Sequence, residues 1–208
     1  MRIALTLHFA KGYIAHPYWP ARERLINLTK EAGVNRARSQ AKREQALKAI
    51  LDAKGMTRAD YDALEADANR PFYTRPDGEI LVPAHQLHGM MAQASEVAPS
   101  SVRIAKTDQV RTILEFQDLR TGRMKADGVW DRFVAPKSGP GQKLSNQRAL
   151  RSDPYLEEFD AVGELRLVTD DLHDKAKRFI EWAGREVGVG ASRKMGWGRF
   201  TVEAWEKA

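Results

Sequence analysis

The sequence predicts an α+β fold with a β-α-β-β-α-β core, into which two long segments are inserted. Apolar residues alternate with polar ones at the start of the chain, which is typical of a half-buried strand. Strands are predicted there and at three later places, over residues 3–9, 110–116, 161–168 and 200–205. Apolar residues at helical spacing predict helices over 83–97 and 171–187. With the insertions set aside, this order is the ferredoxin-like arrangement within a single domain, 1–208.

The first insertion follows strand 1 and is predicted to be helical, over residues 21–70. Its sequence is rich in Ala, Leu, Arg, Lys and Gln, which favour helices. Thr57 and Asp60 have the spacing of a capping box at the start of its third helix. Because the segment is polar, with a narrow apolar stripe around Leu47 and Leu51, we expect a lobe without a core of its own.

The second insertion lies between strands 2 and 3, over residues 120–155. A hairpin around Pro76-Asp77-Gly78 and a helix from Pro83 precede it. Residues 125–151 contain Gly and Pro, are basic and have no clear period, so we expect a functional or disordered excursion. Beyond it, Asp170 or Asp171 is expected to cap the last helix.

The charge of the chain is positive and unevenly distributed. The formal net charge is +6. Residues 103–151 contain eleven Lys/Arg against five Asp/Glu, and residues 22–48 contain eight against three. Segregated charge of this kind makes surfaces that attract phosphate backbones, which points to nucleic acid as a partner.

Composition excludes several classes of protein. The chain contains no cysteine, which excludes disulfides, thiolate metal sites and cysteine nucleophiles. Its apolar runs are too short to span a bilayer, and the N-terminus has the alternation of a strand rather than the apolar block of a signal peptide. We therefore expect a soluble, cytoplasmic protein that requires no cofactor.

A glycine-rich segment, residues 188–200, carries the most specific local signal. Its glycines permit close backbone approach, and its cations and single tryptophan suit phosphate contacts and base stacking. The alternative is a helix cap followed by a tight turn, for which Gly188 alone would suffice. The known nucleotide fingerprints do not fit, because this loop follows a helix and enters the last strand.

The run from Ala191 to Phe200 resembles the C-terminal glycine-rich loop of the RAMP superfamily, the RNA-binding proteins of CRISPR systems. A second segment, from Leu81 to Gly89, is similar to the one that opens the first helix in their backbone (crRNA-binding) subunits. Here it carries His85, Gln86 and His88, where the family commonly has hydroxyl and basic residues. The resemblance implies an RRM-like fold, with residues 120–155 as a protruding thumb and residues 21–70 as a family-specific insertion.

The resemblance also implies RNA as the partner: the crRNA, with its target RNA as a further candidate. Other CRISPR effector subunits, or copies of the same chain, would complete the assembly, and no membrane is expected. The predicted RNA-binding residues are Gly190, Ser192, Arg193, Lys194, Gly196, Trp197, Gly198, Arg199, His85, His88, Arg123, Lys125, Arg132, Lys137 and Lys143. No metal site is predicted, because His85 and His88 lack the glutamate and spacing of a zinc motif.

Two other functions remain open at this point. A metal-independent RNA-processing endoribonuclease of the same superfamily would need a histidine as general acid or base, and His16, just after strand 1, is the candidate. A packed turn residue is the alternative interpretation of that histidine. A basic interaction protein of unrelated function is the third possibility. The hypothesis that we carry forward is a non-catalytic RNA-binding subunit.

Overall fold

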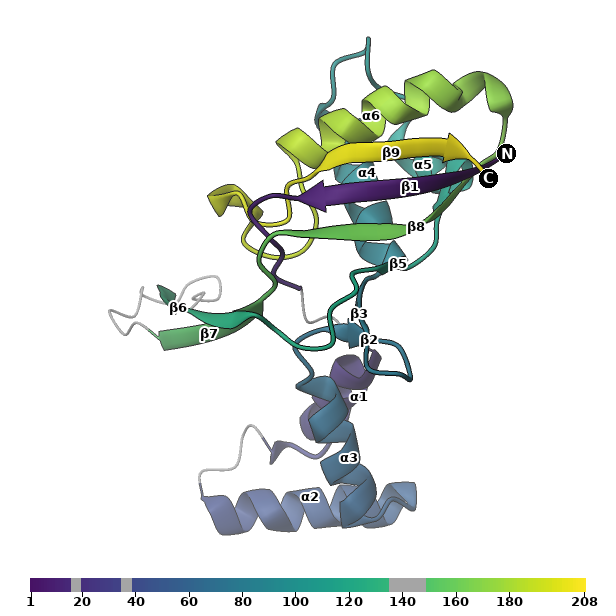
Figure 1. The fold of residues 1–208 in the computed structure, drawn as a ribbon. Coiled ribbons are helices and arrows are strands. Elements are labelled where there is room, and N and C mark those ends of the chain that lie inside the picture. The colour runs from purple at the N-terminus through teal and green to yellow at the C-terminus, as the bar shows by residue number, and fades with distance from the viewer. Residues whose placement is uncertain (16–19, 35–38, 135–148) are drawn as a thin grey trace, which may run out of the picture. The chain divides into compact units, whose positions relative to one another are not determined.

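An antiparallel sheet and the helices on one of its faces form the larger part of the molecule (Figure 1). The structure is a computed structural model that describes residues 1–15, 20–34, 39–134 and 149–208. The chain divides into two units. One contains residues 1–15 and 72–208, and the other contains residues 16–71.

Strand β1 (Arg2–Phe9) lies inside the sheet of the first unit. It pairs antiparallel with β8 (Phe159–Leu167) on one side and with β9 (Thr201–Lys207) on the other. Beyond β8 lie β4 (Leu114–Phe116) and β5 (Leu119–Arg120), which both pair with it. The α+β prediction is confirmed, and this strand order is the one expected of a ferredoxin-like core.

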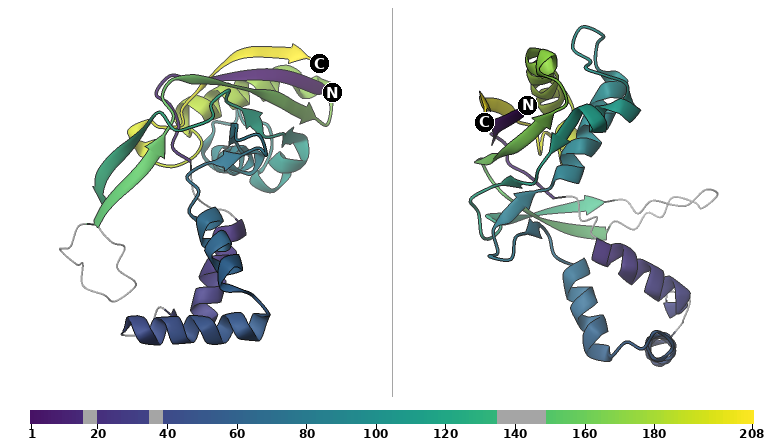
Figure 2. Two further views of the ribbon diagram at one scale, coloured as in Figure 1. Left: turned by 60° about the horizontal axis from the view of Figure 1, so that its bottom comes forward. Right: turned by 90° about the vertical axis from the view of Figure 1, so that its right-hand side faces the viewer.

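The helices α4 (Ala84–Val97) and α6 (His173–Glu186) cover one face of this sheet (Figure 2). Alternate residues of β1, from Ile3 to Phe9, are buried with the apolar stripes of both helices in one core. The intervening residues of β1 face the other way. The sheet therefore has one covered face and one face open to solvent.

At the far edge, β2 (Tyr73–Thr74) and β3 (Ile80–Val82) form the hairpin predicted around Pro76-Asp77-Gly78. Strand β3 continues the sheet by pairing with β5. Gly78 has φ +91°, which explains the glycine in this turn.

Two of the predicted boundaries are wrong. Residues 107–113 form helix α5 (Thr107–Ile113), so the strand predicted at 110–116 begins only at Leu114. A short apolar run fits both the helical and the strand period, so the sequence pattern alone does not separate them. In the structure Val110 is buried as part of the helix. Helix α6 begins at His173 after a 3-10 turn, Asp170–Leu172, and no aspartate side chain caps it.

The excursion predicted to have no period contains a two-stranded ribbon. Strand β6 (Gly128–Val134) pairs antiparallel with β7 (Ala149–Tyr155) over their full lengths, apart from the main sheet. An ion pair between Arg132 and Asp153 joins the two strands. Lys137 and Lys143 lie outside the described residues.

The second unit contains the helices α1 (Pro20–Glu31), α2 (Gln40–Lys54) and α3 (Arg58–Ala68). The capping box predicted at Thr57 and Asp60 is present at the start of α3. The expectation that this segment lacks a core is wrong, because the three helices share a small one made of Leu28, Leu47, Leu51 and Tyr61. The apolar residues of α2, Leu47 and Leu51, pack against Leu28 of α1 and Tyr61 of α3.

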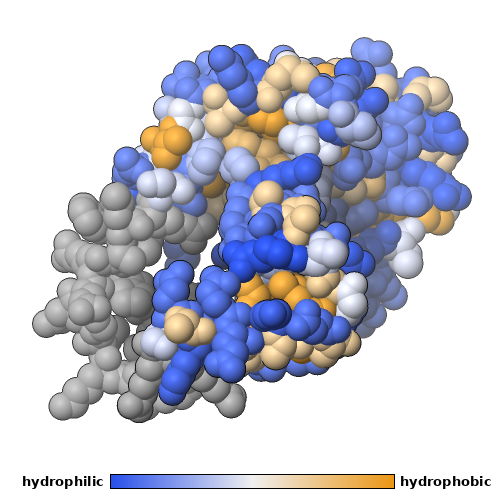
Figure 3. Space-filling model, turned by 90° about the horizontal axis from the view of Figure 1, so that it is seen from below, coloured by the Kyte–Doolittle hydropathy of each residue, from blue (hydrophilic) through white to orange (hydrophobic). Residues whose placement is uncertain are grey.

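The described surface is mainly hydrophilic on the face shown in Figure 3, with apolar side chains in small patches. None of the helices in the described residues is long and apolar enough to cross a membrane.

Two glycines within helices test how α6 packs on β9. A methyl group added at Gly184 would overlap the ring of Phe200 and lie 2.7 Å from its carbonyl oxygen, whereas at Gly89 it would meet nothing within 4 Å. We expect Gly89→Ala to raise the free energy of unfolding by about 0.5–1 kcal/mol. Gly184→Ala should lower it by about 1–3 kcal/mol, despite the same gain in helix propensity. Chemical denaturation measures both, and equal effects would contradict this packing.

Candidate functional site

The glycine-rich segment lies directly against the chain that follows β1. The backbone N–H of Gly198 donates to the carbonyl of Gly12 (2.9 Å), and that of Ala191 donates to the carbonyl of Ile14 (2.8 Å). The segment is also closed on itself, because the N–H of Val189 donates to the carbonyl of Gly198 (2.8 Å). Backbone hydrogen bonds therefore hold the loop between helix α6 and strand β9.

Two glycines of this loop have no room for a side chain. Gly190 and Gly198 have φ +79° and +70°. A Cβ atom at Gly198 would overlap the carbonyl oxygen of Val189, and one at Gly190 would overlap that of Ile14. A simple helix cap would need only Gly188, so the remaining glycines serve a tightly packed loop.

The loop carries its cations on a 3-10 turn, Arg193–Met195. The guanidinium of Arg193 donates from Nη1 to Oε1 of Gln93 on α4 (2.8 Å). Lys194 is exposed and has no hydrogen-bond or ion-pair partner among the residues that the structure describes. The Arg199 guanidinium donates to the carbonyl of Arg185 at the end of α6. Thus Arg193 and Arg199 are anchored, while Lys194 extends into solvent.

Two further features of the turn were not predicted in detail. Nζ of Lys11 donates to the carbonyl of Met195 (2.6 Å), so a fourth cation joins the loop from the end of β1. Its position beside Gly12, directly after strand 1, is the signal that could have found it. Ser192 has φ +58°, and its Oγ is buried without a hydrogen-bond partner in the described part of the chain.

Trp197 packs on the ribbon of β6 and β7. Its ring lies 5.2 Å from that of Tyr155 and 5.8 Å from that of Trp130, measured between centroids. The Arg132 guanidinium stacks over Trp130 at 4.9 Å and pairs with Asp153 (2.9 Å). Trp130 and Tyr155 were absent from the prediction, and only the strand register of the ribbon brings them to the loop.

The other predicted cations of the excursion differ in their availability. Arg123 donates from Nη2 to the carbonyl of Glu158 (3.0 Å), and its Nη1 lies 3.9 Å from Oδ1 of Asp127. Lys125 is exposed and forms no such contact with any described residue. Of the two, Lys125 is the freer to contact a ligand.

The predicted histidines lie at the start of α4. Nε2 of His88 accepts a hydrogen bond from the backbone N–H of Phe116 (3.1 Å), and burial lowers the pKa of His88, so this ring is neutral and engaged in the fold. His85 is exposed, and partial desolvation lowers its pKa. The N–H of Ala84 donates to Oδ1 of Asp118 (2.7 Å), so a carboxylate already occupies this helix N-terminus.

The open face of the sheet carries charges of both signs. Cross-strand neighbours there include Arg166 with Glu115 and His8 with Asp160. On β1, β8 and β9 the outward side chains include no Phe, Tyr or Trp. An RRM-like sheet binds bases by stacking them on such rings. This face therefore lacks the means for base stacking, and the glycine-rich loop is the stronger candidate site.

His16 lies outside the described residues. Across residues 1–15, 20–34, 39–134 and 149–208, no group of three or more His, Asp or Glu residues is placed to hold a metal ion.

His8 makes the open face sensitive to pH. Its Nδ1 lies 2.8 Å from Oδ1 of Asp160, and this hydrogen bond, with the charges of Asp160 and Glu158, raises the pKa of His8. The stabilising contribution is complete below the ordinary histidine pKa and is lost as pH rises through the raised one. We expect His8→Gln to reduce the free energy of unfolding more at about pH 5.5 than at about pH 8.5. A difference that is constant with pH in urea titrations would contradict this.

Trp197 should hold the ribbon in place. An isolated two-stranded ribbon is only marginally stable in water, so its order depends on the aromatic contacts. We expect Trp197→Ala to speed hydrogen exchange of the β6 and β7 amides by roughly tenfold or more, with the amides of β1 and β8 unchanged. Unchanged exchange in the ribbon would show that other contacts hold it.

Comparisons with known proteins place the fold. No family model and no curated protein sequence matches the chain. A chain of the type III-B Cmr-beta complex, whose cryo-EM structure is bound to cognate target RNA, matches with a TM-score of 0.51 and 10% identity. The match covers 99% of this chain but 59% of that one, so this chain spans little more than half of its length.

A second solved structure, Cmr6 from Pyrococcus furiosus, matches at 13% identity over 100% of this chain and 98% of that one, but its TM-score of 0.34 is too low to support an argument. The Cmr-beta match has the higher TM-score and covers nearly the whole of this chain. The chain therefore shares its fold with that chain of the type III-B Cmr-beta complex.

Proposed function

We propose that this chain is a non-catalytic RNA-binding subunit of a CRISPR-type ribonucleoprotein, whose glycine-rich loop grips the phosphate backbone of the crRNA. The observation that carries the proposal is the loop itself: Arg193 and Lys194 stand on a turn that backbone hydrogen bonds hold against residues 12–15. A structure with a chain of similar fold is that of a Cmr complex with target RNA bound, which supports a role in binding RNA.

The geometry of the loop favours phosphate as the bound group. Cations on a fixed backbone lose less conformational entropy when they bind than cations on a mobile one, so more of the interaction energy becomes affinity. Phosphates carry no sequence information, and a subunit that grips them binds RNA of any sequence. Both properties suit a protein that holds a guide RNA of variable sequence.

The remaining predicted residues take supporting roles in this proposal. The ribbon of β6 and β7, with Lys125 at its base and Lys137 and Lys143 in its undescribed part, would be a thumb that reaches along the RNA. The helical unit of residues 16–71 would be a family-specific insertion. The partners would be RNA and other effector subunits or copies of this chain.

Removing the loop cations should weaken RNA binding far more than removing cations elsewhere. We expect Arg193→Ala with Lys194→Ala to reduce the affinity for single-stranded RNA by at least roughly tenfold, since one charge-assisted hydrogen bond contributes about 1.5 kcal/mol or more. Lys42→Ala with Lys48→Ala, on the exposed side of α2, removes the same charge and should cost less than about twofold. Fluorescence anisotropy measures both affinities.

Salt provides an independent readout of the same contacts. For the wild-type protein, log affinity should fall linearly with log salt, with a slope of about −0.7 for each neutralised phosphate. Equal losses in the two double variants, or a flat salt response, would contradict the proposal. Thermal melts control for folding, and gels of the same samples show whether the RNA is cut, which would favour the endoribonuclease alternative.

A further inference from the structure

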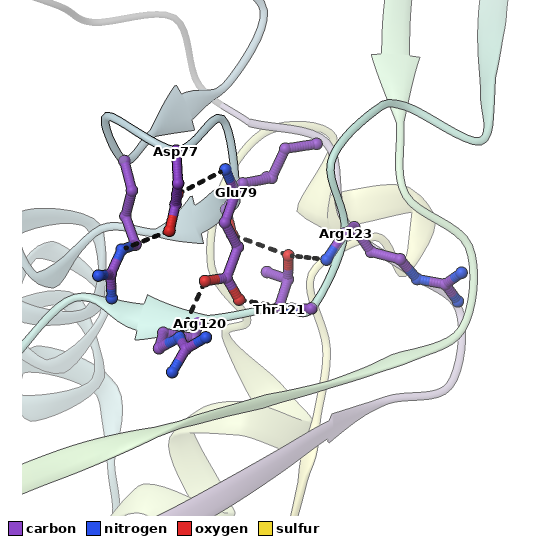
Figure 4. A network of polar contacts seen from close by, with 8 residues as sticks. Asp77, Glu79, Arg120, Thr121 and Arg123 are labelled. Atoms are coloured by element: carbon purple, nitrogen blue, oxygen red, sulfur yellow. Dashed lines mark hydrogen bonds and ion pairs between the residues drawn. The ribbon is translucent and has the colours of Figure 1, made fainter.

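A buried carboxylate lies at the far edge of the sheet, away from the glycine-rich loop in sequence. The side chain of Glu79 is only 6% exposed. Its Oε2 accepts from Nε of Arg120 (2.8 Å), and its Oε1 accepts from the backbone N–H of Gly122 (2.9 Å). Figure 4 shows Glu79 reaching toward Arg120, with Thr121 beside it. Both oxygens of this carboxylate are therefore occupied by the end of β5.

Further hydrogen bonds fix the backbone around Arg120. The hydroxyl of Thr121 donates to the carbonyl of Ile80 (2.8 Å), and the N–H of Ile80 donates to the carbonyl of Arg123 (2.7 Å). Burying a carboxylate costs free energy unless it is fully hydrogen-bonded, as Glu79 is. The result is a rigid base for a side chain that itself faces solvent.

Arg120 is 62% exposed although Glu79 holds it at Nε. Its two terminal nitrogens have no partner among the residues described. A guanidinium held in this way presents a planar fork, which is suited to bidentate binding of a phosphate group.

The fork borders a hollow on the open face of the sheet. Arg120 is the cross-strand neighbour of Val162 on β8, whose side chain is 51% exposed. The hollow measures about 390 Å³ and is lined by Glu79, Arg120, Thr121, Gly122, Asp160 and Val162. Oδ1 of Asp160 is bound to His8, and Glu79 is neutralised by Arg120.

We propose that Arg120, positioned by Glu79, binds a phosphate group of the RNA in this hollow. This proposal rests on the proposed function and adds a second phosphate contact to the glycine-rich loop. The cations that follow, Arg123 and Lys125, extend the positive potential along the same segment. Arg120 is a binding residue, and Glu79 is a positioning residue that acts through it.

A second arginine on the same face is a matched control. Arg166 is 70% exposed and pairs through Nη1 with Oε2 of Glu115 (3.2 Å), whose side chain is 61% exposed. The two arginines thus have the same charge, similar exposure and one acidic partner each. They differ in that the partner of Arg120 is buried and the partner of Arg166 is not.

Four variants, titrated with single-stranded RNA over a range of salt concentrations, test the inference. Arg120→Ala should reduce affinity by roughly tenfold and reduce the magnitude of the salt slope by about 0.7, the value for one phosphate contact, whereas Arg166→Ala should change neither appreciably. Glu79→Gln removes a negative charge, which by simple electrostatics should strengthen RNA binding. The proposal instead requires Glu79→Gln to weaken it, because Arg120 loses its anchor, while Glu115→Gln should leave it unchanged or stronger.

Equal effects at Arg120 and Arg166, or unchanged or tighter binding by Glu79→Gln, would overturn the inference. If Arg120→Ala or Glu79→Gln fails to fold in thermal melts, Arg120→Lys is measured instead. It keeps the charge but loses the fork, so affinity equal to that of the wild type would also overturn the inference. Failure of the wild-type protein to bind RNA would refute the proposed function itself. Binding that depends on Arg193 and Lys194 but not on Arg120 would refute only the second contact.

Discussion

The close backbone approach between the glycine-rich loop and residues 12–15 is the constraint on which the candidate site depends. Hydrogen bonds run from Gly198 to Gly12 and from Ala191 to Ile14, and the carbonyl of Ile14 leaves no room for a Cβ atom at Gly190. These hydrogen bonds attach the loop, which connects α6 to β9, to the residues that follow β1. Strand β9 is itself paired with β1. The loop is therefore as well defined as the core beside it, although it lies at the surface.

Three separate parts of the chain contact this loop. Its Trp197 receives the rings of the β6–β7 ribbon, its Arg193 is tied to Gln93 on α4, and Lys11 reaches it from the end of β1. A ribbon of two strands would have little stability alone, so an anchored tryptophan is an effective way to attach it. The cations and the ribbon consequently form one connected surface rather than two independent features.

Local patterns in the sequence were sufficient to predict the strands and helices of the core. They were not sufficient to predict the long-range contacts that complete the candidate site. The alternation from Ile3 to Phe9 and the stripe of α6 have clear periods, and both elements were predicted. The β6–β7 ribbon was missed because its strands mix polar residues, such as Arg132 and Asp153, with apolar ones in no clear period. Partners such as Lys11 and Met195, or Glu79 and Arg120, are far apart in sequence, and only the sheet topology brings them together.

The distribution of paired and unpaired charge separates the surfaces that could hold RNA from those that could not. On the open sheet face most cations already have carboxylate partners, so that face offers an approaching phosphate little net attraction. Lys194 and the terminal nitrogens of Arg120 differ, because the described residues leave them without partners while the surrounding backbone is fixed. A phosphate bound at either place would replace water at those nitrogens and leave the ion pair of Arg120 with Glu79 in place. Positive net charge alone does not identify a binding surface, whereas a cation with free donor nitrogens on a rigid support does.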